Sequence, residues 1–135
     1  MLIEYHCILF GTGQTAQCEY DPTGDLLEIY FVLGEATAAV ELTDNIVLRF
    51  DWDRGTPFNL GIISVSTLLQ LSRYGKMHFE LLVKEWPEEA QDKILAMLRR
   101  PPLTEFLTVS SYTPAHKSEI IPITTIRQIP VLAAA

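Results

Sequence analysis

Apolar residues in the first half of the chain gather in short runs that are bounded by turn residues. The clearest run is LLEIYFVL, at residues 26–33, where β-branched and aromatic residues are concentrated between Pro22 and Gly34. This composition and length predict a strand. In IVLRFDW, at residues 46–52, positions alternate between an apolar and a mainly polar series. The alternation predicts a strand with one dry face and one wet face.

Two further runs complete a set of four predicted strands. ATAAVEL occupies residues 36–42, and FNLGIISVS occupies residues 58–66 with Gly61 inside it, where we expect a bulge or a close backbone approach. The loops between the four runs are short. A parallel pairing needs a crossover of about a dozen residues or more, so the sequence predicts an antiparallel meander.

The segments on either side of this meander carry weaker patterns. LIEYHCILF, at residues 2–10, is strand-like and is followed by the polar stretch GTGQTAQ, so it is either a fifth strand or a poorly packed extension. STLLQLSRYG, at residues 66–75, offers Ser66 as an N-cap and Gly75 as a left-handed stop. This pattern predicts a short helix.

The second half contains one clear helix signal. Residues 87–100 start with Pro87 at the first helical position, followed by glutamates, and end with two arginines before Pro101. Negative charge at the beginning and positive charge at the end favour a helix over 87–100. Its apolar positions fall at helical spacing and predict a face that packs on a sheet: Ala90, Ile94, Leu95 and Leu98.

The remaining segments of the second half read as extended. Residues 76–86 fit a strand better than a helix, and residues 103–112 and 118–126 are two further candidates. Pro122 lacks a backbone donor, which should confine the last of these to an edge or a bulge. A boundary near residues 74–76 divides the chain into a meander at 18–74 and an extension at 75–135, within one domain over 1–135.

Composition and charge restrict the class of protein. The chain has 135 residues, 48% of them hydrophobic, with a net charge of -7, which favours a folded domain and disfavours direct nucleic-acid binding. The charge would suit a basic protein partner, although acidity can also serve solubility alone. Cys7 and Cys18 form no disulfide framework, and no apolar run reaches about 20 residues. We therefore expect a cytoplasmic protein without a membrane segment.

One set of residues between positions 18 and about 70 forms a recognisable pattern: Tyr20, Asp21, Asp25, Leu26, Ile29, Phe31, Glu41, Asp44, Asn45, Ile46, Asp51, Asp53, Gly61 and Ile62. Through these residues the stretch resembles a family of small bacterial and archaeal proteins called domain of unknown function 2283. The chain departs from the family pattern at Leu27 and Glu28, and Ile63 stands where the family has an outward glutamate. The resemblance implies a fold and no established activity. The apolar Ile63 suggests that the C-terminal half covers its face.

The acidic turn residues are the main candidates for chemistry. Asp21 and Asp25 flank a Pro-Thr-Gly turn, and side-chain hydrogen bonds to the backbone of such a turn are the preferred interpretation. Asp51 and Asp53 resemble the start of a calcium loop that lacks its third acid and its final glutamate. Metal binding would need help from Asp21, Asp25 or Asp44. The sequence therefore predicts no metal ligand, catalytic residue or cofactor-binding residue.

The other reactive side chains lack the partners that catalysis requires. His6, His78 and His116 have no metal-ligand spacing, and neighbours on a strand such as His6 and Cys7 point to opposite faces. Ser110 and Ser111 lack a nucleophile-elbow motif. The stretch from Gly11 to Gly13 lacks the following helix of a phosphate loop. Trp52 and Trp86 are interpreted as core or rim packing.

We expect an α+β domain in which an antiparallel meander and a short helix precede a longer amphipathic helix and C-terminal strands. The leading functional hypothesis is a non-enzymatic interaction or oligomerising module. One alternative is an antitoxin-like partner that neutralises a toxin. Another is a small enzyme, or a ligand- or metal-binding protein, that uses acids at one end of the sheet. DNA binding would need more basic residues than Arg99, Arg100, Lys117 and Arg127.

Overall fold

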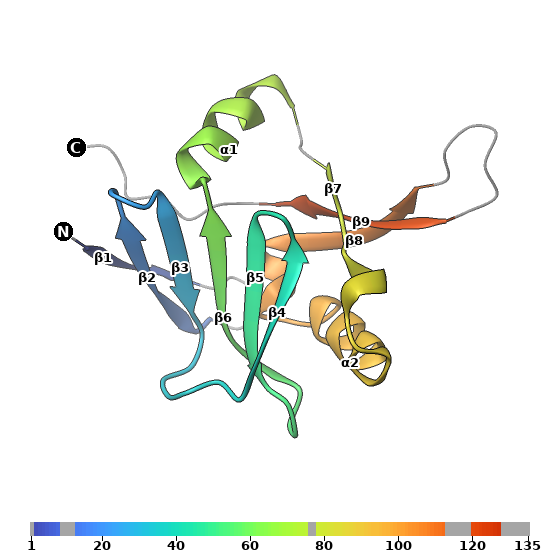
Figure 1. Cartoon of the computed structure of the whole chain (residues 1–135). Helices are drawn as coiled ribbons and strands as arrows, with labels where there is room; N and C mark the ends of the chain where they lie inside the picture. Colours follow the sequence, from blue (N-terminus) through green and yellow to red (C-terminus); the bar gives the residue numbers. More distant parts are fainter. Residues whose placement is uncertain (1, 9–12, 76–77, 113–119, 128–135) are drawn as a thin grey trace.

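A six-stranded antiparallel sheet forms the first half of the protein (Figure 1). The computed structural model describes residues 2–8, 13–75, 78–112 and 120–127. The strands of the large sheet are β1 (Ile3–Ile8), β2 (Thr15–Asp21), β3 (Leu26–Tyr30), β4 (Ala38–Thr43), β5 (Ile46–Asp51) and β6 (Thr56–Ile63). Helix α1 (Val65–Leu71) follows β6 directly. The predicted α+β class is confirmed.

The second half adds one longer helix and a smaller sheet. Strands β7 (His78–Glu80), β8 (Leu107–Tyr112) and β9 (Ile121–Ile126) form a three-stranded antiparallel sheet with β9 in the middle. Helix α2 (Glu88–Leu98) lies between β7 and β8 in the chain. Short 3-10 turns occupy Ser72–Tyr74, Val83–Glu85 and Leu103–Glu105. None of the described helices has the length and hydrophobicity needed to cross a membrane.

The strand order of the large sheet is β1-β2-β3-β6-β5-β4, which differs from a simple meander at one step. Strands β4, β5 and β6 do pair in sequence, but β3 pairs with β6 instead of β4. The connection at residues 31–37 crosses to the far edge of the sheet, and the amide of Phe31 continues the β3–β6 ladder by donating to the Phe58 carbonyl at 2.8 Å. The four strands β3, β4, β5 and β6 therefore have the order of a Greek key.

Strand β2 was missed in the sequence because its outward positions are polar and its fully buried inward residues, Ala16 and Cys18, are small. Ala16 and Cys18 are fully buried, whereas Gln17 and Glu19 lie on the other face. The polar stretch at residues 11–17 was wrongly treated as a connection throughout. Residues 3–8 do form an additional strand, β1, which lies at the edge of the sheet.

One face of the large sheet, called here the inner face, packs against α2 and the smaller sheet. Leu27, Ile29, Leu48 and Leu60 are fully buried on this face, in one apolar cluster with residues of the second half. The members from α2 and the segment after it include Ala90, Ile94, Met97, Leu98, Leu103 and Phe106. Phe31 meets Phe106 with ring centroids 5.8 Å apart. The cluster therefore joins the two halves of the chain.

The prediction that the C-terminal half covers Ile63 is wrong. Ile63 pairs with Leu26 on the opposite, outer face and is 40% exposed. Strand alternation explains the difference, because Ile62 points inward and is buried. The second half covers Ile62 and its inward neighbours.

Both helices begin at other residues than the sequence predicted. Helix α2 starts at Glu88 with Pro87 as its N-cap, so Pro87 precedes the first helical position. Helix α1 starts at Val65 after Ser64, which has a left-handed φ of 58°, so Ser66 is not its N-cap. A side chain from another turn caps α1 instead, as described below.

The extended segments of the second half are shorter than the sequence predicted. Within residues 78–86 only His78–Glu80 is strand, and Leu103–Glu105 is a 3-10 turn ahead of β8. Pro122 lies in the central strand β9, so its predicted edge or bulge position is wrong. It is tolerated because it lies near the start of β9, ahead of the residues of β9 that pair with β7. At this position its carbonyl accepts a hydrogen bond from the Leu81 amide at 3.0 Å.

Gly61 is neither a bulge nor a close approach. Its register with β3 and β5 is regular, and a Cβ there would meet no atom nearer than 3.7 Å. The irregularity in β6 lies instead opposite Arg49 and Phe50, whose partners are Asn59 and Pro57. Gly55, in the β5–β6 turn, has a φ of 61°, a left-handed conformation that disfavours a side chain.

We expect substitution by alanine to have opposite effects on stability at Gly61 and at Gly55. Gly61→Ala should raise the free energy of unfolding by about 0.4–1 kcal/mol, because it restricts the unfolded chain without a clash. Gly55→Ala should lower it by about 1–2 kcal/mol, because an alanine in left-handed conformation is strained. Urea unfolding of both variants measures the difference. A destabilised Gly61→Ala protein would contradict the regular register at this position.

Candidate functional site

The turn between β2 and β3 meets the beginning of α1 through Asp25. Asp25 has a φ of 51°, a conformation that aspartate tolerates better than most residues. Its carboxylate accepts the backbone amide of Ser66 at 3.1 Å and the Ser66 hydroxyl at 2.6 Å. Its carbonyl accepts the amide of Val65 at 3.2 Å. Asp25 therefore caps α1 from another element, 41 residues earlier in the chain.

Tyr20 completes this network. Its hydroxyl donates to the Asp25 carboxylate at 2.8 Å, and this bond is the main cause of the raised pKa of Tyr20. The hydrogen bond from the Ser66 hydroxyl is the main cause of a lowered pKa of Asp25, below its ordinary value of 3.8. Asp25 is therefore ionised at neutral pH, and Tyr20 is a neutral phenol.

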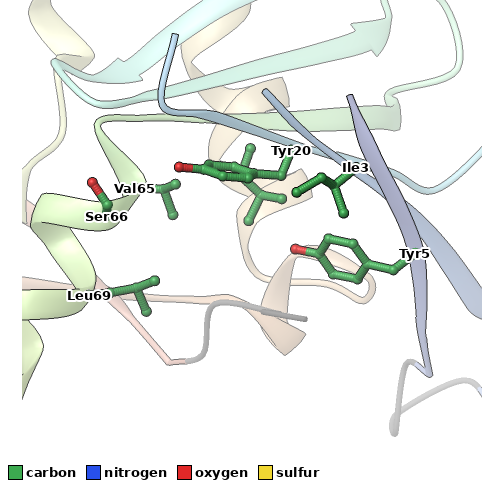
Figure 2. Close-up of a pocket in the computed structure, with 7 residues that line it drawn as sticks. Ile3, Tyr5, Tyr20, Val65, Ser66 and Leu69 are labelled. Atoms are coloured by element: carbon green, nitrogen blue, oxygen red, sulfur yellow. The ribbon is translucent and has the colours of Figure 1, made fainter. Parts of the chain in front are cut away.

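A pocket of about 290 Å³ lies beside this network, where α1 faces the inner face of β1, β2 and β3 (Figure 2). Its lining residues are Ile3, Tyr5, Tyr20, Leu27, Val65, Ser66 and Leu69. Most of the wall is aliphatic or aromatic, and polar atoms come from the hydroxyl-bearing residues. Burial is the main cause of the raised pKa of Tyr5, about 12, so its side chain is an uncharged phenol at neutral pH. We call this the α1 pocket.

The two edges of the large sheet differ in how they are covered. At the β4 edge, the Leu82 amide donates to the Leu42 carbonyl at 2.9 Å, and the Trp86 indole donates to the Glu41 carbonyl at 2.8 Å. At the other edge, β1 pairs with β2, and no described strand lies beyond it. The inward side chains of β1 are only half-buried, whereas their neighbours Ala16 and Cys18 are fully buried. The apolar core is therefore only partly covered where the sheet ends at β1.

The outer face of the sheet carries a polar network that the sequence analysis did not find. Glu28 accepts hydrogen bonds from Arg49 at 3.0 Å, from Asn59 at 3.2 Å and from the Tyr30 hydroxyl. Burial and the bond with Glu28 raise the pKa of Tyr30. These residues come from three strands, and only the β3–β6–β5 order brings them together.

A row of glutamates crosses the same outer face. Glu4 on β1 lies opposite Glu19 on β2, and Glu19 lies opposite Glu28 on β3. The row continues through Gly61 and Val47 and ends at Glu41 on β4. This places part of the negative charge of the chain on one surface.

The five acids considered for metal binding or catalysis do not converge. Asp21 accepts the Thr23 amide at 3.0 Å, as expected for a turn residue, and lies with Asp25 and Asp44 at the α1 end of the sheet. Asp51 and Asp53 lie at the opposite end, in the β5–β6 turn. Within the described residues, no three of the histidine, cysteine and acidic side chains are close enough to hold a metal ion.

The calcium-loop resemblance is explained by turn contacts. The Asp51 carboxylate lies 3.8 Å from Arg54 and accepts the Thr37 hydroxyl at 3.3 Å. The Asp51 carbonyl accepts the amide of Gly55 at 2.9 Å, which closes the turn. These contacts stabilise the β5–β6 hairpin.

The two cysteines lie near each other on the inner face. Cys7 Sγ and Cys18 Sγ are 3.9 Å apart, and both cysteines are free. Burial is the main cause of the raised pKa of Cys18, about 12, so it is a thiol at neutral pH. His6 lies on the outer face of β1, opposite Gln17, which confirms that it and Cys7 point to different faces.

The remaining candidates occupy structural positions. The ring nitrogen Nδ1 of His78 lies 3.0 Å from the Thr125 hydroxyl, and His116 lies outside the described residues. Ser110 and Ser111 are exposed on β8. Residues 11 and 12 are also outside the described residues, and Gly13 leads into strand β2.

The tryptophans pack as the sequence analysis expected. Trp86 is buried in the apolar cluster. Trp52 is partly buried, and the Lys93 ammonium lies 4.6 Å from its ring centroid, within the range of a cation–π interaction.

The tertiary cap predicts that Asp25 contributes more to stability than an ordinary surface acid. Asp25→Ala should lower the free energy of unfolding by about 1–3 kcal/mol, because it removes the cap and leaves alanine with a positive φ. Asp25→Asn should cost less, because asparagine tolerates this φ and keeps one acceptor oxygen. Chemical denaturation measures both, and Asp44→Ala is the matched control. Equal effects of Asp25→Ala and Asp44→Ala would contradict the capping role.

The lowered pKa of Asp25 also predicts a pH dependence. A carboxyl whose pKa is lower in the folded state contributes stability above its unfolded pKa, ordinarily 3.8, and loses it as the pH falls through the folded pKa. The stability difference between the native chain and Asp25→Asn should therefore be full at about pH 6 and shrink below about pH 4. Unfolding curves at several pH values test this, and a constant difference would contradict an ionised cap.

In comparisons with known protein families, curated proteins and solved structures, none gave a significant match to this chain.

Proposed function

We propose that the protein is a non-enzymatic interaction module that associates with another protein strand through the edge of β1. The observation that supports this most directly is the difference between the two sheet edges. Leu82 and Trp86 cover the β4 edge at Leu42 and Glu41, whereas β1 has no described strand on its far side. An edge strand offers backbone donors and acceptors to an added strand.

A second copy of the chain is the partner that fits this edge best. Two β1 strands that meet antiparallel about a two-fold axis at Tyr5 would place Glu4 of each copy opposite His6 of the other. Glu4 and His6 are both exposed on the outer face, so this register places an acid opposite a group that can carry positive charge. On the inner face, Ile3 would lie opposite Cys7 of the second copy.

The apolar surface that continues from β2 onto β1 supports the same arrangement. Ile3, Tyr5 and Cys7 extend the inner face beyond the buried residues of β2, and each is half-buried. A strand added beside β1 would cover these side chains further. Burying apolar area contributes roughly 25 cal/mol per Å², so this cover would stabilise the complex.

The acidic outer face supports a second candidate function. The row of Glu4, Glu19, Glu28 and Glu41 would suit a basic protein partner, as in an antitoxin-like neutralising role. The alternative of an acid-based enzyme or metal site receives less support, because the candidate acids lie at opposite ends of the sheet. Two free cysteines accord with the reducing cytoplasm proposed as its location.

The family resemblance corresponds to a continuous part of this structure. Residues 18–70 run from β2 to α1 and contain the Greek-key strands and the Asp25 cap. We propose that this unit is what the chain shares with the domain of unknown function 2283. The edge strand β1 and the smaller sheet lie outside it.

Charge exchange at the β1 edge tests the proposed pairing. The native chain should form dimers in light scattering across a concentration series. His6→Glu should weaken the dimer about tenfold, because two pairs of like charges would face each other across the two-fold axis. The double variant Glu4→His with His6→Glu exchanges the two side chains and should restore the dimer.

Two controls separate pairing from general charge effects. Glu80→Lys changes an exposed charge on β7 and should leave the dimer unchanged. A native chain that stays monomeric at every concentration would contradict self-association. A chain that is monomeric alone and binds a basic protein, with loss of binding in Glu19→Gln, would favour the second candidate.

A further inference from the structure

We infer that the α1 pocket binds a small primary amine, in its ammonium form, that carries a compact apolar group. This binding site does not depend on the proposed edge pairing, although Ile3 and Tyr5 belong both to the pocket lining and to the strand proposed to pair. The inference rests on the direction of the hydrogen bonds at the polar end of the pocket and on the apolar character of its remaining wall.

The hydroxyl protons at the polar end are already committed to Asp25. Tyr20 and Ser66 both line the pocket, and each has one hydroxyl proton. Each donates that proton to the Asp25 carboxylate, at 2.8 Å and 2.6 Å. Their oxygens can therefore only accept a further hydrogen bond from a ligand. A ligand group that donates hydrogen bonds fits this arrangement.

Electrostatics favour a positively charged donor over a neutral one. Asp25 lies directly behind the two hydroxyl oxygens and places a carboxylate at this end of the pocket. An ammonium group has three donors and no acceptor. The net charge of -7 adds a field that attracts cations. At the Tyr20 and Ser66 end of the pocket, a carboxylate or phosphate ligand would face acceptor oxygens and a like charge.

The rest of the pocket limits the body of the ligand. Ile3, Leu27, Val65 and Leu69 provide aliphatic walls, and Figure 2 shows the Tyr20 ring extending between β2 and α1 with its hydroxyl toward Ser66. An ammonium near the face of a tyrosine ring gains a cation–π attraction. A volume of about 290 Å³ is at the small end of ligand pockets and suits a single ring or a short alkyl chain.

Binding of three matched probes tests the inference. Benzylamine, benzyl alcohol and benzoate have similar size and differ in charge, and each is titrated into the full chain and followed by NMR. Benzylamine should shift the resonances of Tyr20, Ser66 and Leu69 saturably. Benzyl alcohol should bind at least about tenfold more weakly, and benzoate should bind more weakly still.

Three variants locate the site. Asp25→Asn keeps a residue that tolerates the positive φ and removes the charge, and it should weaken benzylamine binding about tenfold. Asp44→Asn makes the same change in a neighbouring turn and should leave binding unchanged. Leu69→Trp should abolish binding by filling the pocket, with the Asp25 cap unaltered.

Specific outcomes would overturn the inference. Equal binding of benzylamine and benzyl alcohol would remove the role of charge, and unaltered binding in Leu69→Trp would place the amine elsewhere. Absence of saturation would exclude the site altogether. The titration is repeated on the His6→Glu variant, whose pocket lining is unchanged, so that a failure of edge pairing is distinguished from a failure of amine binding.

Discussion

Burial of the inner face of the large sheet is the interaction on which the other features depend. Leu27, Ile29, Leu48 and Leu60 lie in adjacent strands and would expose a broad apolar surface if nothing covered them. Helix α2 and the segment around Phe106 provide that cover, and this explains why the chain needs its second half. The C-terminal half therefore stabilises the sheet of the N-terminal half.

This cover is uneven, and its unevenness creates the two proposed binding regions. Trp86 and Leu82 occupy the β4 edge at Glu41 and Leu42, so this part of the edge is covered. Toward β1, the inward side chains are only half-buried, and α1 leaves a pocket beside them. An exposed strand edge and a small apolar pocket thus arise from the same structural cause.

Asp25 contributes both to the fold of the chain and to the hydrogen bonds at its surface. It has a positive φ in the β2–β3 turn, where the sequence predicted side-chain hydrogen bonds from Asp21 and Asp25 to the backbone of the turn. Asp21 makes such a bond, to Thr23, whereas the carboxylate of Asp25 bonds to Ser66 and Tyr20. Its carboxylate then caps a helix that starts 40 residues later, which no local pattern indicates. The same carboxylate orients the Tyr20 and Ser66 hydroxyls and so determines which hydrogen bonds the pocket can offer.

The sequence by itself determined which segments form strands and helices where burial alternates strongly. β3 was predicted from its concentration of β-branched and aromatic residues between turn residues. β5 and α2 were predicted because their apolar residues repeat with the period of a strand or a helix, and Asp21 was correctly placed in a turn. β2 was missed, because small buried residues such as Ala16 give little apolar signal. Only the tertiary structure decided that β3 pairs with β6, that Glu28 meets Arg49 and Asn59, and that Asp25 reaches α1. Each of these contacts joins residues far apart in the chain. The burial of the inner face determines which of these residues meet, and a local sequence pattern does not encode that burial.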